Sequence, residues 1–208
     1  MSHKVAYSPW LVALASFAIP RNRFRRAFGV LAASITMQEE DLATGKAYIH
    51  GHDKAGQPCM YVFAGKHSVY TTTPERTQQL VIYCIELAVR EVMKAGTTSA
   101  LAVFDFGGDF GWSSMDIDAA RYLVKMLSLN FPESVSRILI VNNGIVFSTL
   151  WAAVSPFLSA RTTAKVRFLG TDPAALHEYI DPANVPAELG GEADIEADGT
   201  GYAKPASA

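Results

Sequence analysis

The sequence has 208 residues, with 18 basic and 20 acidic side chains and a formal charge of −2 at pH 7. Half of the residues are apolar and 18% are charged, which excludes an intrinsically disordered chain because disorder needs low hydrophobicity and high charge. A near-neutral total argues against nucleic-acid binding, which needs clustered lysine and arginine. The apolar surplus indicates a large core, or a core that in part lines a hydrophobic site.

The N-terminal region and the two cysteines bear on the compartment. Cys59 and Cys84 form neither a disulfide framework nor a zinc-binding spacing, which favours a reducing, cytoplasmic environment. The apolar run at 10–19 resembles a secretory signal, but Pro9 and the arginine-rich stretch at 21–26 favour a buried first helix instead.

The pattern of apolar residues predicts alternating helices and strands. Two short helices are expected at 8–19 and 22–38, separated by Pro20. The elements expected after them are a hairpin with strands at 46–50 and 59–63, a helix at 74–95, a strand at 100–106, a helix at 115–130, a strand at 137–143, a helix at 145–158, a strand at 165–169 and a helix near 173–179. This alternation predicts an α/β layer with a largely parallel sheet, followed by a disordered acidic tail at 192–208.

The 23 residues between Arg137 and Arg161 carry no charge, which is long enough for a membrane span. The Asn-Asn-Gly sequence at 142–144 and Pro156 interrupt this stretch, so a buried strand, a turn and an apolar helix explain it better. The helix at 145–158 nevertheless has more large apolar side chains than one core-facing stripe needs.

Signals for catalysis and metal binding are weak. Asp-Phe-Gly occurs at Asp105 and Asp109, but no kinase catalytic loop or glycine-rich loop accompanies it. We interpret Asp105 as a structural hydrogen-bond acceptor at the end of a strand. His50, His52 and Asp53 lack a further ligand at a recognised spacing, so a solvated turn is favoured over a metal site. We therefore expect no enzymatic activity, no metal and no cofactor.

Six segments in order resemble the Sec14-like, or CRAL-TRIO, lipid-binding family. They span about residues 46–191 and read Tyr-Ile-His-Gly-His-Asp-Lys-Ala-Gly-Gln-Pro-Cys at 48–59, Val-Phe-Asp-Phe-Gly-Gly at 103–108, Asn-Phe-Pro-Glu at 130–133, Ile-Val-Asn-Asn at 140–143 with Phe-Ser-x-x-Trp at 147–151 and Pro-Phe-Leu at 156–158, Thr-Thr-Ala-Lys-Val at 162–166, and Val-Pro-Ala-Glu-Leu-Gly-Gly at 185–191. The resemblance implies a mixed, mostly parallel sheet flanked by helices, an apolar pocket and a gating helix. It also implies three regions: a short N-terminal helical lobe at 1–44, the lipid-binding domain at 45–191 and the tail at 192–208.

The resemblance also implies which residues bind a ligand. Glu133, Thr162 and Lys165 match the positions that bind a phosphatidylinositol headgroup in the family. The residues expected to form the gating helix and the pocket strand are Phe147, Leu150, Trp151, Val154 and Phe157, together with Ala100, Ala102 and Phe104.

This sequence departs from the family in two places. The first helix has Val12 and Phe17 among the positions where the family carries basic residues, and Ala100 stands where its choline-lipid binders have serine. We therefore expect a carrier of a phosphatidylinositol-like phospholipid, with a sterol, isoprenoid or tocopherol-like ligand as the alternative. A second alternative is a lipid-sensing module with a signalling protein partner. The expected protein is a cytoplasmic monomer that contacts membranes transiently, aided by a net charge of +4 over 134–170.

Overall fold

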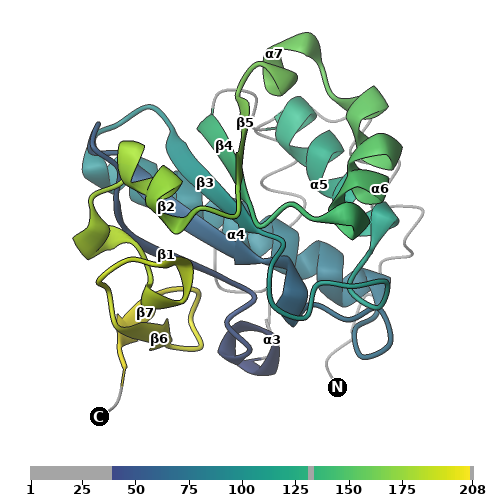
Figure 1. Cartoon of the computed structure of the whole chain (residues 1–208), viewed down its shortest axis with the longest axis horizontal. Helices are drawn as coiled ribbons and strands as arrows, with labels where there is room; N and C mark the ends of the chain where they lie inside the picture. Colours follow the sequence, from purple (N-terminus) through teal and green to yellow (C-terminus); the bar gives the residue numbers. More distant parts are fainter. Residues whose placement is uncertain (1–38, 131–133, 207–208) are drawn as a thin grey trace, which may run out of the picture. The chain divides into compact units, whose positions relative to one another are not determined.

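The computed structural model describes residues 39–130 and 134–206, so the expected N-terminal helices at 8–19 and 22–38 lie outside the described residues. A five-stranded sheet in the order β1-β2-β3-β4-β5 forms the centre of the described part (Figure 1). Only β1 runs antiparallel to its neighbour, and the remaining pairs are parallel. The predicted mostly parallel α/β sheet is confirmed. The strands are β1 (Ala47–His52), β2 (Pro58–Phe63), β3 (Ala100–Asp105), β4 (Val135–Val141) and β5 (Val166–Gly170).

Helix α4 (Pro74–Ala95) shows how local sequence sets element boundaries. The side chain of Thr73 accepts a hydrogen bond from the backbone N–H of Arg76, and Pro74 occupies the first turn, where its missing N–H costs nothing. Gly96 ends the helix in the left-handed conformation, with φ of 68°. The other α-helices are α3 (Glu39–Ala43), α5 (Ile117–Asn130), α6 (Ile145–Val154) and α7 (Ala160–Thr163).

The alternation of side chains along the strands separates two faces of the sheet. On one face, Ala102 of β3 and Ile138 of β4 point toward α4, α5 and α6. On the other face, Leu101, Val103 and Leu139 are fully buried in a core with the residues that follow β5. Both faces of the central strands are therefore covered, as expected for parallel strands with continuous apolar sequences.

The cover of the second face consists of 3₁₀-helices, and the helix expected near 173–179 is one of them. These short helices are η3 (Pro173–Glu178), η4 (Pro182–Asn184) and η5 (Ala187–Leu189), while η1 (Ala64–Lys66) and η2 (Ser155–Phe157) lie elsewhere in the fold. Pro173 and Pro182 each open one of these segments, in the first turn, where the missing N–H of proline costs nothing. Leu176 and Ile180 still reach the core and are fully buried.

The expectation of a disordered tail at 192–208 is wrong for the residues that the structure describes. Strands β6 (Ile195–Ala197) and β7 (Ala203–Pro205) form an antiparallel pair, and Figure 1 shows them below β1. The hydroxyl of Tyr202 donates to Glu91 Oε1 on α4 at 2.6 Å, and Tyr83 donates to the carbonyl of Thr200 at 2.7 Å. The segment is acidic and glycine-rich, but its one tyrosine anchors it to a helix far away in sequence.

The uncharged stretch between Arg137 and Arg161 folds as β4, a turn and α6, as predicted. Asn142 makes this turn with a positive φ of 55°, a conformation that asparagine tolerates better than most residues. Within residues 39–130 and 134–206, none of the helices combines the length and the hydrophobicity needed to cross a bilayer.

Candidate functional site

An apolar cavity lies between the sheet and helices α4, α5 and α6. It has two neighbouring compartments of about 210 and 110 Å³. Both compartments are lined in part by Phe104 and Phe106, by Ile138 and by Leu150 of α6, so these side chains separate the compartments. The cavity is therefore a continuation of the hydrophobic core in which the side chains leave space unfilled.

The three residues predicted as the pocket strand line this cavity. Ala100, Ala102 and Phe104 alternate along β3 toward α4 and α5, and Phe104 also borders the smaller compartment. The two alanines leave space between the sheet and the helices because a methyl group fills little of it. Ser134, whose carbonyl accepts a 2.9 Å hydrogen bond from the N–H of Ala100, lines the same compartment.

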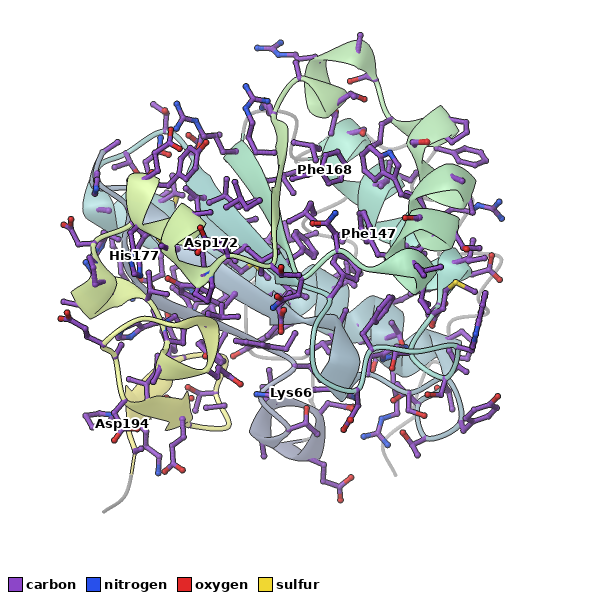
Figure 2. All side chains as sticks on the ribbon, viewed as in Figure 1. Lys66, Phe147, Phe168, Asp172, His177 and Asp194 are labelled. Carbon is purple, nitrogen blue, oxygen red and sulfur yellow. The ribbon has the colours of Figure 1, made fainter. Side chains whose placement is uncertain are left out.

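Helix α6 forms one wall of the smaller compartment. Four of its five predicted residues, Phe147, Leu150, Trp151 and Val154, line this compartment. Figure 2 shows Phe147 near Phe168 of β5, and their ring centroids are 5.8 Å apart.

The fifth predicted residue, Phe157, does not line the cavity. It lies in the 3₁₀-helix η2 and is 58% exposed, with the guanidinium of Arg121 lying 5.0 Å from its ring centre. The change from α to 3₁₀ winding at Ser155, just before Pro156, turns Phe157 away from the helix face used by Leu150 and Val154. Ile145, at the start of α6, is 88% exposed and was not singled out from the sequence.

Two of the three predicted headgroup residues, Thr162 and Lys165, lie at the end of the sheet where β4 and β5 begin. Thr162 lies in α7, lines the smaller compartment, and shares a 2.9 Å hydrogen bond with Ser159. The ammonium group of Lys165 donates to the carbonyl of Val135 at 2.7 Å. Glu133 lies outside the described residues, so the structure brings two of the three predicted residues to one edge of the sheet.

The opposite end of the larger compartment, where β2 and β3 end, is more polar. Lys46, His67, Ser114 and Asp116 line it. His67 Nε2 lies 3.3 Å from Asp116 Oδ2, and the backbone N–H of Ala119 donates to Asp116 Oδ1 at 2.8 Å. The hydrogen bond from His67 is the main cause that holds the pKa of Asp116 below its usual range, and the N–H of Ala119 adds to it. Sequence reasoning missed this group because its members come from separate segments, each unremarkable alone.

The residues considered for metal binding do not form a metal site. His50 and His52 lie at the end of β1, and Asp53 Oδ1 accepts hydrogen bonds from the N–H groups of Ala55 and Gln57 in the following turn. Among the residues that the structure describes, no group of three or more histidine, cysteine or acidic side chains could hold a metal ion.

A family model described as CRAL/TRIO domain matches residues 42–191. The chain belongs to this family. The matched range contains all five strands of the central sheet and, among the described residues, every helix that lines the cavity. The cavity described above is thus a feature of the CRAL/TRIO domain itself.

Similar proteins have related names. A CRAL-TRIO domain-containing protein of Schizosaccharomyces pombe is 30% identical over 72% of this chain and 33% of its own length. A phosphatidylinositol transfer protein of Eremothecium gossypii is 30% identical over 77% of this chain and 36% of its own length. The chain thus spans about a third of these relatives. The crystal structure of Sfh5 matches 81% of this chain and 64% of its own chain, with a TM-score of 0.64 and 17% identity, which shows a shared fold.

Proposed function

We propose that this CRAL/TRIO domain binds one lipid in the cavity between its sheet and helices and transfers it between membranes. The observation that carries the proposal is the unfilled apolar space under α4, α5 and α6. Removal of acyl surface from water supplies the binding energy, at about 25 cal/mol per Å². The relatives named as phosphatidylinositol transfer proteins support the same function.

Exposed apolar side chains beside the cavity support membrane contact. Ile145, the first residue of α6, and Phe157, in η2 just after α6, are exposed, and Phe168 of β5 is also exposed. The sequence from 134 to 170 has a net charge of +4 and no acidic residue, which favours an anionic membrane surface. Movement of α6 at a bilayer would open the cavity without exposing its apolar lining to water, and this is the role we propose for the gating helix.

Transfer of a fluorescent lipid between vesicles tests this proposal. Ile145→Asp and Phe157→Asp should each reduce the transfer rate roughly tenfold, because they place a charge where apolar contact with the bilayer is required. The fold should persist because both side chains are exposed. Met93→Asp is the matched control, since Met93 is exposed at the far end of α4. Rates equal to that of the control would contradict the membrane contact. Trp151 is a poorer choice because it packs against Phe168 with ring centres 5.0 Å apart.

Two classes of lipid are candidates for the ligand. A phosphatidylinositol-like ligand is supported by the names of relatives and by the positions of Thr162 and Lys165 at one edge of the sheet. A neutral ligand is supported by the alanine floor at Ala100 and Ala102. The same assay with phosphatidylinositol, phosphatidylcholine and a sterol compares them directly. A lipid-sensing module with a protein partner would bind lipid without moving it in catalytic amounts.

A further inference from the structure

The two compartments of the cavity lie side by side across the sheet. The larger one reaches β2 and α4, where Met60 and Leu80 line it. The smaller one reaches β5 and α6, where Val166 and Val154 line it. A molecule that occupies both compartments must therefore pass the side chains that stand between them.

The side chains that line both compartments form a partition between them. They come from the sheet and the loop after β3, from α5 and from α6: Phe104, Phe106, Ile138, Ala120, Leu123 and Leu150. Helices α5 and α6 lie side by side (Figure 1), so Leu123 and Leu150 supply most of the bulk on the helix side. Leu150 is buried and is the member of the partition that α6 contributes.

The aromatic half of the partition is fixed in place. The ring of Phe106 lies between Phe110 and Phe147, with ring centres 4.9 and 4.5 Å away. Phe147, labelled in Figure 2, packs in turn against Phe168. A tail that crosses the partition must therefore displace the aliphatic side chain of Leu150 more readily than the packed rings.

The volumes indicate how long a tail each compartment holds. An apolar cavity of about 150 Å³ binds one benzene molecule. By the same ratio, the larger compartment of about 210 Å³ holds roughly eight carbons, and the smaller one of about 110 Å³ holds roughly four more. A short tail therefore fits the larger compartment alone, whereas a tail of about twelve carbons fits only if it passes the partition.

The polar end of a ligand is better accommodated in the larger compartment. Ser114 is buried and lines this compartment, and its hydroxyl group has no hydrogen-bond partner among residues 39–130 and 134–206. The ionisable groups beside it are paired within the protein. Lys46 lies 3.3 Å from Asp41, and His67 lies 3.3 Å from Asp116. An uncharged polar group such as a hydroxyl thus suits this compartment better than an anion.

The smaller compartment suits the apolar end of a ligand. Thr162 is the one polar side chain among its described lining residues, and its hydroxyl shares a 2.9 Å hydrogen bond with Ser159. The last carbons of a tail would otherwise meet apolar side chains there, among them Trp151 of α6. Trp151 can therefore report whether a tail has reached this compartment.

We propose that Leu150 selects ligands by the length of their tail. The larger compartment holds the polar end and the first part of the tail, and only a longer tail passes Leu150 and ends beside Trp151. This inference rests on the proposed function and adds the residue that determines which tails fit. Because Leu150 and Trp151 belong to α6, a tail that passes the partition packs against the inner face of the proposed gating helix, whereas a shorter tail ends before it.

Two alcohols with a bromine atom on the carbon opposite the hydroxyl test this division: bromo-octanol and bromo-dodecanol. Bromine quenches the fluorescence of a tryptophan that it contacts. The full chain is delipidated and carries Trp10→Phe and Trp112→Phe, so that Trp151 is its only tryptophan. Both alcohols should bind, and calorimetry should show bromo-dodecanol at least about tenfold tighter because more of its surface leaves water. Only bromo-dodecanol should quench Trp151.

Substitutions in the partition should change this result in opposite directions. Leu150→Ala opens the partition, so bromo-octanol should quench Trp151 as well. Ala120→Leu narrows the partition from α5 without creating a cavity, and provides a second variant if Leu150→Ala does not fold. It should remove the quenching by bromo-dodecanol and reduce its advantage in affinity to less than about threefold. Ala152→Leu is the matched control, because Ala152 is exposed on α6 and lines neither compartment.

Equal quenching by the two alcohols before any change in the partition would overturn the inference. Quenching by bromo-dodecanol that persists in Ala120→Leu, or bound bromo-dodecanol that does not quench Trp151, would contradict it too. If neither alcohol bound, the inference would also be wrong, and vesicle transfer would decide the proposed function separately. Lipid transfer by the same preparation would retain the proposed function, whereas no transfer would contradict it as well.

Discussion

Asp105 links the ends of two neighbouring strands. Its Oδ1 accepts hydrogen bonds from the N–H of Gly107 at 2.9 Å and from Nδ2 of Asn142 at 2.7 Å, which ties β3 to the turn before α6. The prediction that Asp105 is a structural acceptor is confirmed. Its position in an Asp-Phe-Gly sequence therefore reflects a requirement of the turn. This carboxylate thus joins the end of β3 to the turn that precedes α6.

His50 is expected to make the stability of the folded protein depend on pH. Its Nε2 is buried and has no hydrogen-bond partner among the described residues. Burial lowers the pKa of His50, and the nearby His52 lowers it further. The unfolded chain, with a histidine pKa of about 6.5, therefore binds the proton more readily than the folded chain. The stability contributed by neutral His50 is fully present above that pH and is lost as the pH falls toward the folded-state pKa.

Urea unfolding at several pH values measures this effect. The unfolding midpoint of the wild type should fall between about pH 7 and about pH 5, and His50→Gln should flatten this slope because glutamine does not titrate. The same slope in both proteins would show that His50 does not determine the pH dependence.

At the scale of elements, the pair β6–β7 is expected to stabilise the domain through Tyr202. Tyr202→Phe removes the 2.6 Å hydrogen bond to Glu91 and should lower the free energy of unfolding by about 1–2 kcal/mol. Tyr70→Phe is the control, because Tyr70 is exposed in the loop before α4. Chemical denaturation of the two variants compares them, and equal stabilities would mean that the C-terminal pair does not support the domain.

Elements set by local sequence could be predicted, whereas elements set by distant contacts could not. Pro74 and Gly96 mark the ends of α4, and the structure begins and ends the helix beside them. Strands β6 and β7 are held in place by the hydrogen bond from Tyr202 to Glu91 on α4, more than a hundred residues earlier in the sequence. No local sequence pattern reveals this contact. The burial of Lys46 could not be predicted for the same reason. A charged residue before a strand is expected to be solvated, and only the fold brings Asp41 and Arg76 to it.

For the whole molecule, the two faces of the sheet should respond differently to a ligand. Helices α5 and α6 border the cavity, whereas η4 and η5 lie beside the buried core on the opposite face, which includes Val185 and Leu189. Hydrogen exchange of the delipidated and lipid-loaded protein should therefore slow in α5 and α6 and change little in η4 and η5. Equal slowing on both faces would indicate general stabilisation and would argue against a ligand in this cavity.

The alternation along β3 also separates positions that can change from positions that must be kept. Leu101 and Val103 hold the buried core on one side, while Ala100 and Ala102 shape the cavity floor on the other. A larger residue at either alanine would narrow the cavity, and at Ala100 it would also crowd Leu87 and Ala88 of α4, which belong to the same buried cluster. Substitution of Ala102 is therefore the most direct way to change the volume of this cavity while the opposite face of β3 stays as it is.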